Sequence, residues 1–327
     1  METGTMHESM DKFIKSLELE GQISTAKGYQ FSLSKYDGFC RMKGIDPLRV
    51  TTETVRLFAS YLSEVRSSKG IPLATSTQAT RLSAVKAWYE WMAKRRMILA
   101  DPAKGIELPK VPKGVTLKDY LSLQEATALL QTQAARMERS KPNTLTWARE
   151  CRNLALIAIA LATGKRRSSI RNLKVSDMDF RRNEVRVEKE KGKSGAVFPC
   201  ARWAMALAKE YVEKARPILL RGAADSGWLF LAWRGSRKIG SERFSGILES
   251  LVAETIEANP DLEELPTKNI TPHSLRVSFA TLLFQNGCNI RSINELMLHE
   301  KLSTTARYTP IPLEDLRRAC RMAHPRA

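Results

Sequence analysis

Apolar residues in the first hundred positions recur at the three- and four-residue spacing of amphipathic helices. Ser24 and the pair Thr51 and Thr52 precede two of these segments and are expected to start helices there. The apolar stripes are Phe13, Ile14 and Leu17; Tyr29, Leu33, Tyr36 and Cys40; Val55, Phe58, Leu62 and Val65; and Leu82, Val85, Trp88 and Met92. The pattern predicts a small helical bundle over residues 1–100.

Residues 101–117 break this periodicity. Prolines and glycines alternate there with lysines, a composition typical of an extended, cationic linker. The residues concerned are Pro102, Lys104, Gly105, Pro109, Lys110, Pro112, Lys113 and Gly114. The sequence therefore predicts a linker over residues 101–117 between two domains.

The second predicted domain, residues 118–327, opens with Ser122 and Glu125 at the spacing of a capping box. A strongly apolar helix is expected from Trp147 to Thr163, with Gly164 as its C-terminal stop. Two strand candidates, residues 184–189 and 196–199, flank a turn-prone Lys-Gly-Lys-Ser-Gly segment, and helical patterns follow. The predicted fold is mostly α with a small antiparallel sheet (α+β).

The net charge of the chain indicates which kind of partner it binds. The chain carries 53 Lys and Arg against 35 Asp and Glu, a net charge of +18. Such an excess is typical of proteins that bind a polyanion, because each neutralised phosphate releases a counterion; a merely cationic surface is the alternative. Candidate contacts to a DNA backbone, each of which can equally belong to a solvated face, are Arg81, Lys86, Lys94, Arg95, Lys110 and Lys113.

Other classes of protein fit less well. The N-terminus is polar and has no apolar segment of the export type, and the longest apolar run, Leu154 to Ala162, is too short to span a bilayer. Five scattered cysteines without a C-x-x-C pair argue against a zinc finger and a disulfide scaffold. We expect a cytoplasmic protein with no membrane partner.

Phosphodiester cleavage requires a catalyst that neutralises developing charge, activates a nucleophile and protonates the leaving oxygen. Arg166 follows Gly164, while His273 and Arg276 lie at i and i+3 after Thr271 and Pro272. Two guanidinium groups can clamp phosphate oxygens without a metal. The histidine-bearing segments are rich in Arg, Ser and Thr, whereas a metal nuclease would need clustered carboxylates. A metal-dependent hydrolase using two histidines therefore ranks below an arginine clamp.

A nucleophile is available nearer the C-terminus. Tyr308 follows His299 by nine residues. A phenol has a pKa of about 10 and attacks only when a base or nearby cations activate it. The histidines and arginines of these segments have the required chemistry.

Taken together, these segments resemble the tyrosine recombinase or phage integrase family. The matching runs are Thr163-Gly164-Lys165-Arg166, residues 271–281 around His273 and Arg276, and Leu296-Met297-Leu298-His299 followed by Ser303 to Tyr308. The resemblance implies an N-terminal core-binding domain and a C-terminal catalytic domain of the Xer-like, two-domain type. It also implies catalytic roles for Arg166, Lys191, His273, Arg276, His299 and Tyr308. Lys191 would be the general acid, with Lys193 as its rival.

Two positions depart from the family pattern. Ser169 stands where an acidic residue usually follows the first arginine by three positions, and Leu298 replaces the glycine before the histidine of the third segment. Neither residue takes part in a chemical step. Ser169 removes the usual support of the active-site histidine.

The resemblance implies site-specific recombination of double-stranded DNA through a 3′-phosphotyrosine, with no cofactor, metal or ATP. It further implies a homo-oligomer, with a dimer on each site and a tetramer in the synapse. An apolar stripe, Leu313, Leu316, Cys320 and Ala323, would dock either on a neighbouring protomer or on its own domain. The alternatives are a type IB topoisomerase and a DNA-binding accessory protein without catalysis.

Overall fold

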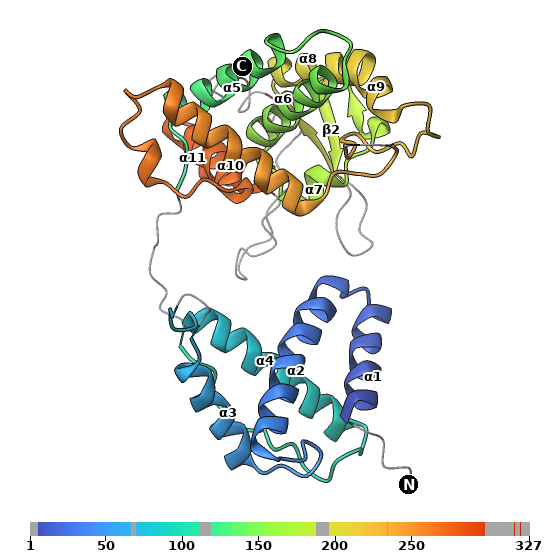
Figure 1. The fold of residues 1–327 in the computed structure, drawn as a ribbon, viewed down its shortest axis with the longest axis vertical. Coiled ribbons are helices and arrows are strands. Elements are labelled where there is room, and N and C mark those ends of the chain that lie inside the picture. Colours follow the sequence, from blue (N-terminus) through green and yellow to red (C-terminus); the bar gives the residue numbers. More distant parts are fainter. Residues whose placement is uncertain are drawn as a thin grey trace. The chain divides into compact units, whose positions relative to one another are not determined.

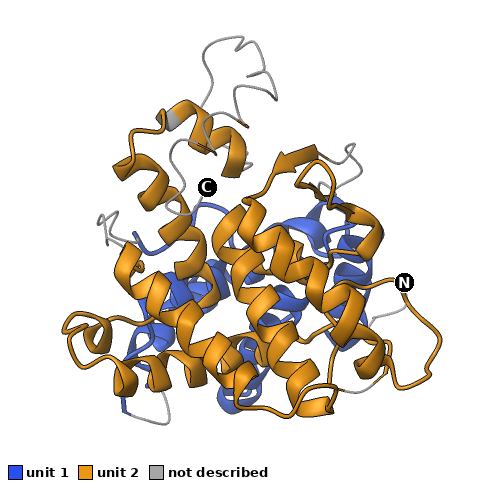
Figure 2. Ribbon diagram, turned by 90° about the horizontal axis from the view of Figure 1, so that it is seen from above, with its two compact units in different colours: residues 1–115 blue, residues 116–327 orange. Residues whose placement is uncertain are grey.

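The computed structural model describes residues 6–66, 70–110, 119–187, 196–233 and 235–297, together with Arg317 and Arg321. The chain forms two compact units, residues 1–115 and 116–327 (Figure 2). None of the helices in the described ranges is long and apolar enough to cross a bilayer.

The described part of the first unit is a helical bundle (Figure 1). Its helices are α1 (Met6–Leu19), α2 (Ile23–Lys43), α3 (Thr52–Glu64) and α4 (Thr75–Lys94). The predicted apolar stripes lie on these helices, except that Val65 follows the end of α3 as its C-cap residue. The expectation for Ser24 is wrong: α2 begins one residue earlier, and Ser24 lies inside its first turn. Thr51 does precede α3, but its hydroxyl makes no capping hydrogen bond to the backbone.

Aromatic rings fill the core of this bundle. The hydroxyls of Tyr36 and Tyr89 are hydrogen-bonded at 2.7 Å, and Tyr89 donates to the carbonyl oxygen of Pro47 at 2.9 Å. These bonds satisfy phenols that would otherwise be buried at a cost. Ala103 and Ile106 are buried in the same core. The first residues of the segment expected to be linker therefore pack against the bundle.

The second unit places helices around a small sheet (Figure 1). Its longer helices are α5 (Leu123–Glu138), α6 (Leu145–Thr163), α8 (Arg202–Glu210), α10 (Ser241–Ala258), α11 (Pro272–Gln285) and α12 (Ile290–Met297). Its shorter segments are α7 (Arg167–Arg171), η1 (Val175–Asp177), η2 (Tyr211–Ala215), α9 (Arg216–Leu220) and η3 (Leu265–Thr267). The predicted capping box is confirmed, since Glu125 N–H donates to the Ser122 hydroxyl and Ser122 N–H donates to the Glu125 carboxylate.

Helix α6 is the centre of this unit and packs against α5, α8 and α11. Almost every residue from Trp147 to Thr163 is buried. One of them is an arginine: Arg152 donates to the carbonyl oxygen of Leu231 at 2.9 Å and to the side-chain oxygen of Asn153. The helix ends at Gly164 with φ 58°, as predicted for a left-handed stop.

The described strands form one antiparallel sheet in the order β1 (Met178–Asp179), β2 (Glu184–Val187), β3 (Ala196–Pro199). In the pairing of β2 with β3, Val185 faces Phe198. The predicted hairpin strands are confirmed within the described ranges; the turn between them lies outside those ranges. Strand β1, only two residues long, carried no periodic signal in the sequence. The fold is mostly α with a small antiparallel sheet, as predicted.

Candidate active site

Gly164 brings the end of α6 against α11. Its positive φ is the conformation that glycine adopts without strain, and a Cβ added at Gly164 would overlap the ring of Phe279. Only a residue without a side chain permits this approach. The Thr-Gly-x-Arg segment and the helix that carries His273 and Arg276 are therefore held in direct contact.

Helix α11 begins as the sequence predicts. Thr271 and Ser274 form reciprocal capping hydrogen bonds, and Pro272 occupies the first helical position. The two candidate side chains of this helix differ in exposure. His273 is exposed, whereas Arg276, one turn later, is 4% exposed.

Arg276 links three segments of the unit. One terminal nitrogen donates to the carbonyl oxygen of Gly164 at 2.7 Å, and the other donates to the carbonyl oxygen of Met297. A guanidinium has five N–H donors, so these bonds leave others for a ligand. Burial, together with the positive charge of Arg166, lowers the pKa of Arg276 to about 10.

Arg166 immediately precedes α7 and is exposed. Its two basic neighbours are engaged elsewhere: Arg167 donates to the hydroxyl of Ser245 on α10, and Lys165 is buried. Within the described ranges, no carboxylate forms an ion pair with Arg166 or Arg276. Repulsion between these two cations is therefore relieved most directly by an anionic ligand.

The sequence predicts no role for Lys165 beyond its place in the Thr163–Arg166 run. Its ammonium donates to the carbonyl oxygen of Leu296 at 2.7 Å and lies over the ring of Phe198. Leu296 is near the end of α12, and Phe198 belongs to β3. The sequence held no signal for this burial, because a lysine beside two arginines is usually solvated.

Several predicted residues lie outside the described ranges. They are Lys113, Lys191, Lys193, Leu298, His299, Tyr308 and the apolar stripe after residue 310. Their roles stay predictions. Strand β3 follows the segment of Lys191 in the chain, and α12 precedes His299. Both of these described elements contact Lys165.

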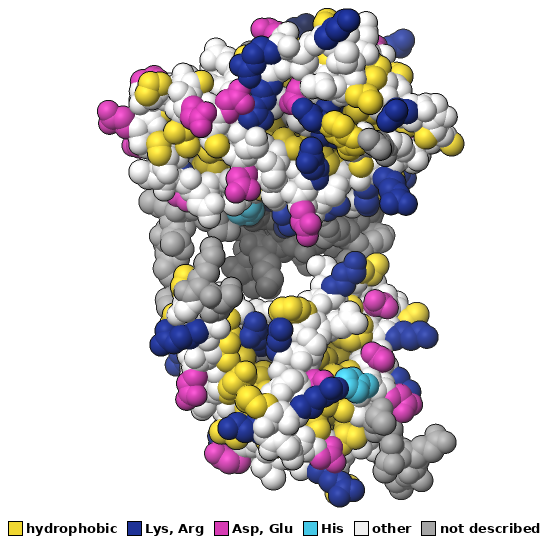
Figure 3. Space-filling view, viewed as in Figure 1, with side chains coloured by type: hydrophobic (Ala, Val, Ile, Leu, Met, Phe, Trp, Pro, Cys, Tyr) yellow, Lys and Arg dark blue, Asp and Glu magenta, His cyan; other side chains and the backbone are white. Residues whose placement is uncertain are grey.

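Three of the candidate DNA contacts of the first unit interact with residues of that unit. The Lys86 ammonium donates to the carbonyl oxygen of Ile106, Lys94 pairs with Glu90, and Arg95 stacks over the ring of Trp91. Arg81 is half-buried and Lys110 is exposed. Figure 3 shows basic side chains spread over the visible face of each unit, with acidic ones among them.

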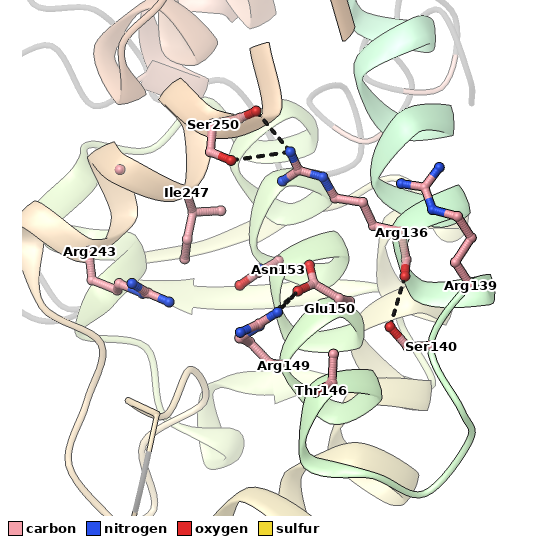
Figure 4. A pocket seen from close by; sticks show the side chains of 11 residues that line it. Arg136, Arg139, Ser140, Thr146, Arg149, Glu150, Asn153, Arg243, Ile247 and Ser250 are labelled. Carbon is pink, nitrogen blue, oxygen red and sulfur yellow. Dashed lines mark hydrogen bonds and ion pairs between the residues drawn. The ribbon is translucent and has the colours of Figure 1, made fainter. Parts of the chain in front are cut away.

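An arginine-lined pocket lies between α5, α6 and α10, with a volume of about 480 Å³ (Figure 4). Arg136 and Arg139 both bind Glu254, and Arg149 binds Glu150. The pairs with Glu254 join α5 to α10, and the two carboxylates offset part of the pocket's positive charge. None of the described catalytic candidates, Arg166, His273 and Arg276, lines it. Among the described residues, no three potential metal ligands of the His, Cys, Asp and Glu types gather in one place.

Comparison with protein families matches both units. Residues 121–312 match the model of the phage integrase family, and residues 10–96 match the model of the phage integrase N-terminal SAM-like domain. Tyrosine recombinase XerC 2 of Ralstonia nicotianae is 28% identical over 318 residues, covering 97% of this chain and 85% of the relative. Tyrosine recombinase XerC of Lactobacillus delbrueckii subsp. bulgaricus is 32% identical over 257 residues, 79% of each chain.

Solved structures share the fold. XerH recombinase bound to its difH substrate before cleavage has a TM-score of 0.63 at 17% identity, covering 96% of this chain and 81% of that one. The Tn1549 transposon integrase in complex with circular intermediate DNA has a TM-score of 0.61 at 18% identity, covering 95% and 98%. The family matches, supported by the XerC relatives, settle the classification. This chain belongs to the phage integrase family of tyrosine recombinases.

Proposed function

We propose that this protein is a site-specific recombinase that cuts and rejoins double-stranded DNA through a 3′-phosphotyrosine intermediate. The observation that carries the proposal is the pair Arg166 and Arg276. The two guanidinium groups repel each other, Arg276 is nearly buried, and no described carboxylate pairs with either. A DNA phosphate supplies the missing negative charge.

The roles follow from the chemistry of a phosphodiester. Arg166 and Arg276 donate to the nonbridging oxygens, where negative charge grows in the transition state. Tyr308 attacks phosphorus after its phenol proton passes to a base, for which His273 and His299 are the candidates. A P–O bond to tyrosine forms as the bond to the 5′ oxygen breaks.

The leaving 5′ oxygen takes a proton from Lys191, with Lys193 as the alternative donor. Because the phosphotyrosine bond retains the energy of the phosphodiester, a 5′ hydroxyl from a partner strand can reverse the step. No ATP, metal or other cofactor enters this sequence of events.

Recombination requires two strand exchanges between the two DNA sites, and each exchange uses one pair of active sites. We therefore propose a dimer on each site and a tetramer in the synapse. The net charge of +18 supports DNA as the partner of a cytoplasmic, nucleoid-associated enzyme. The likeness in fold to a transposon integrase makes the ends of a mobile element the first substrates to examine.

A strand-exchange assay tests the function. Two labelled duplexes from the ends of the encoding element are incubated with the protein in the presence of a chelator and without ATP. We expect recombinant duplexes from the wild-type protein and none from Tyr308→Phe, which should still bind DNA. Relaxation of supercoils without strand exchange would instead identify a topoisomerase, and DNA binding without cleavage would identify an accessory protein.

A further inference from the structure

Lys165 occupies an unusual position for a lysine. Its side chain is 3% exposed, although it lies between Gly164 and the exposed Arg166. Burying an ammonium group is costly unless hydrogen bonds and negative potential replace its water. The contacts of the Lys165 ammonium must therefore offset the cost of its burial.

Two contacts of the Lys165 ammonium connect it to other elements of the second unit. The hydrogen bond to the carbonyl oxygen of Leu296, at 2.7 Å, reaches the last turn of α12, where the helix dipole presents its negative end. The contact over the ring of Phe198 reaches β3 and has the arrangement of a cation–π interaction. One side chain thus joins the segment of Arg166 to two other elements.

Arg276 binds the next carbonyl along the same helix end. Leu296 accepts from Lys165, and Met297 accepts from Arg276. Two cations from separate segments therefore bind consecutive carbonyl oxygens in the last described turn of α12. His299 follows Leu296 by three residues in the chain.

We propose that Lys165 is a positioning residue for DNA cleavage. It fixes the end of α12 against the Arg166 segment, so that the chain leading to His299 starts from a defined place beside Arg276. The inference rests on the proposed recombinase function and deepens it. Lys165 is too buried to touch the phosphate itself, so it acts through α12.

The test measures single-turnover cleavage of a nicked duplex that traps the covalent complex. Lys165→Met keeps an unbranched apolar stem over Phe198 but cannot donate to Leu296. A misplacement of about 1 Å in a catalytic group is enough to slow a reaction ~100-fold, and we expect the cleavage rate of Lys165→Met to fall by about 10- to 100-fold. Affinity for the same duplex should not change.

Lys165→Arg retains a cation that can reach the Leu296 carbonyl and should recover much of the lost rate. Lys214→Met, at an exposed lysine that pairs with Glu210, is the matched control and should cleave like the wild type. If Lys165→Met fails to fold, Lys165→Gln takes its place, because its shorter, uncharged side chain loses the contact of the ammonium with the Leu296 carbonyl. Its cleavage rate should also fall below that of the wild type, and a wild-type rate in folded Lys165→Gln would overturn the positioning role.

A second substrate separates the two contacts of Lys165. Replacing the leaving 5′ oxygen by sulfur removes the need for a general acid, because a thiolate leaves without protonation. The defect of Lys165→Met should persist on this substrate, since it arises at α12. Full recovery of the rate there would overturn the assignment and place the effect on the hairpin that carries Lys191.

Failure of this inference is distinguishable from failure of the proposed function. If the wild-type protein forms no covalent adduct with any substrate, the recombinase proposal itself fails. If the wild type cleaves and folded Lys165→Met cleaves at the same rate, only the positioning role is wrong.

Discussion

The guanidinium of Arg276 donates a hydrogen bond to the carbonyl oxygen of Gly164 over 2.7 Å, joining residues 112 positions apart in the chain. This bond connects the Thr-Gly-x-Arg segment to the helix that begins at Thr271. It orients Arg276 and at the same time fixes the turn that presents Arg166. Within the described ranges, the Arg276 guanidinium is thereby held by backbone carbonyls and not by a carboxylate.

Replacing Arg276 should impair catalysis far more than DNA binding. Lys cannot reproduce two hydrogen bonds in fixed directions, so Arg276→Lys loses either a backbone bond or a phosphate contact. Removal of one transition-state donor costs about 2.7–4 kcal/mol, which corresponds to a loss of ~100- to 1,000-fold in rate. Single-turnover cleavage and a binding titration on the same duplex measure the two quantities.

Arg152→Lys is the control, because Arg152 is also buried and also donates to a backbone carbonyl, that of Leu231. It should lower the melting temperature while folded protein retains its cleavage rate. Equal loss of cleavage in both variants would show that Arg276 acts only through stability.

Gly164→Ala should destabilise the second unit and slow cleavage together. The left-handed conformation costs a non-glycine residue about 1–2 kcal/mol, and overlap with the Phe279 ring adds about 1–3 kcal/mol. Thermal unfolding and the cleavage assay give the two effects. Gly246→Ala, inside α10 where a new methyl group meets no atom within 4 Å, should leave stability the same or slightly higher.

A second substitution tests whether overlap with the Phe279 ring causes the loss of stability. Phe279→Leu in the Gly164→Ala background gives the methyl group more room and should restore part of the lost stability. If the double variant is no more stable than expected from adding the two single effects, the close approach to Phe279 is not the source of the strain.

Part of the stability that the protein loses on acidification should come from Asp225. Its hydrogen bonds from Arg216 lower the pKa of the carboxyl to about 2, against about 3.9 when unfolded. A lowered carboxyl pKa stabilises the folded state above the unfolded pKa, and this contribution disappears as pH falls from about 4 to about 2. Urea unfolding of wild type and Asp225→Asn across this range should show two curves that converge in acid. A difference that stays constant with pH would contradict the pairing.

The C-terminal segment should matter for assembly. Arg317 forms an ion pair with Glu184 of β2, whose side chain is almost fully buried. On the proposed function, deletion of residues 311–327 should reduce joining of two half-sites more than binding to a single half-site, measured by native gel shift. Arg317→Ala, which removes this ion pair without deleting the segment, should retain assembly. Equal losses for the two DNA species on deletion would count against the segment as an assembly element.

The sequence predicted the features that depend on local rules. The capping box at Ser122, the helix start at Thr271 and Pro272 and the stop at Gly164 depend on residues within four positions, and all three were found. What the sequence did not predict depends on tertiary contact. In the sequence, Lys165 is expected to be solvated and Arg152 interrupts an apolar helix. Their burial is explained only by their carbonyl partners, which are 131 positions away for Lys165 and 79 positions away for Arg152.

The same limit applies to the candidate site. Residue spacing identified Arg166, His273 and Arg276 as candidates but gave no information on their exposure. The two members of the H-x-x-R pair prove unequal, because Arg276 turns into the contact between α6, α11 and α12 while His273 stays at the surface. Periodicity places residues on a helix, whereas the depth of each side chain depends on the neighbouring helices.

The most direct measurement is the identity of the protein–DNA bond. A duplex nicked near the crossover point is incubated with protein and chelator, denatured and digested, and the DNA-linked peptide is analysed by mass spectrometry. We predict a peptide containing Tyr308 attached to a 3′ phosphate, a free 5′ hydroxyl on the other strand, and no adduct with Tyr308→Phe. An adduct on another residue, or one that survives in Tyr308→Phe, would contradict the proposed chemistry.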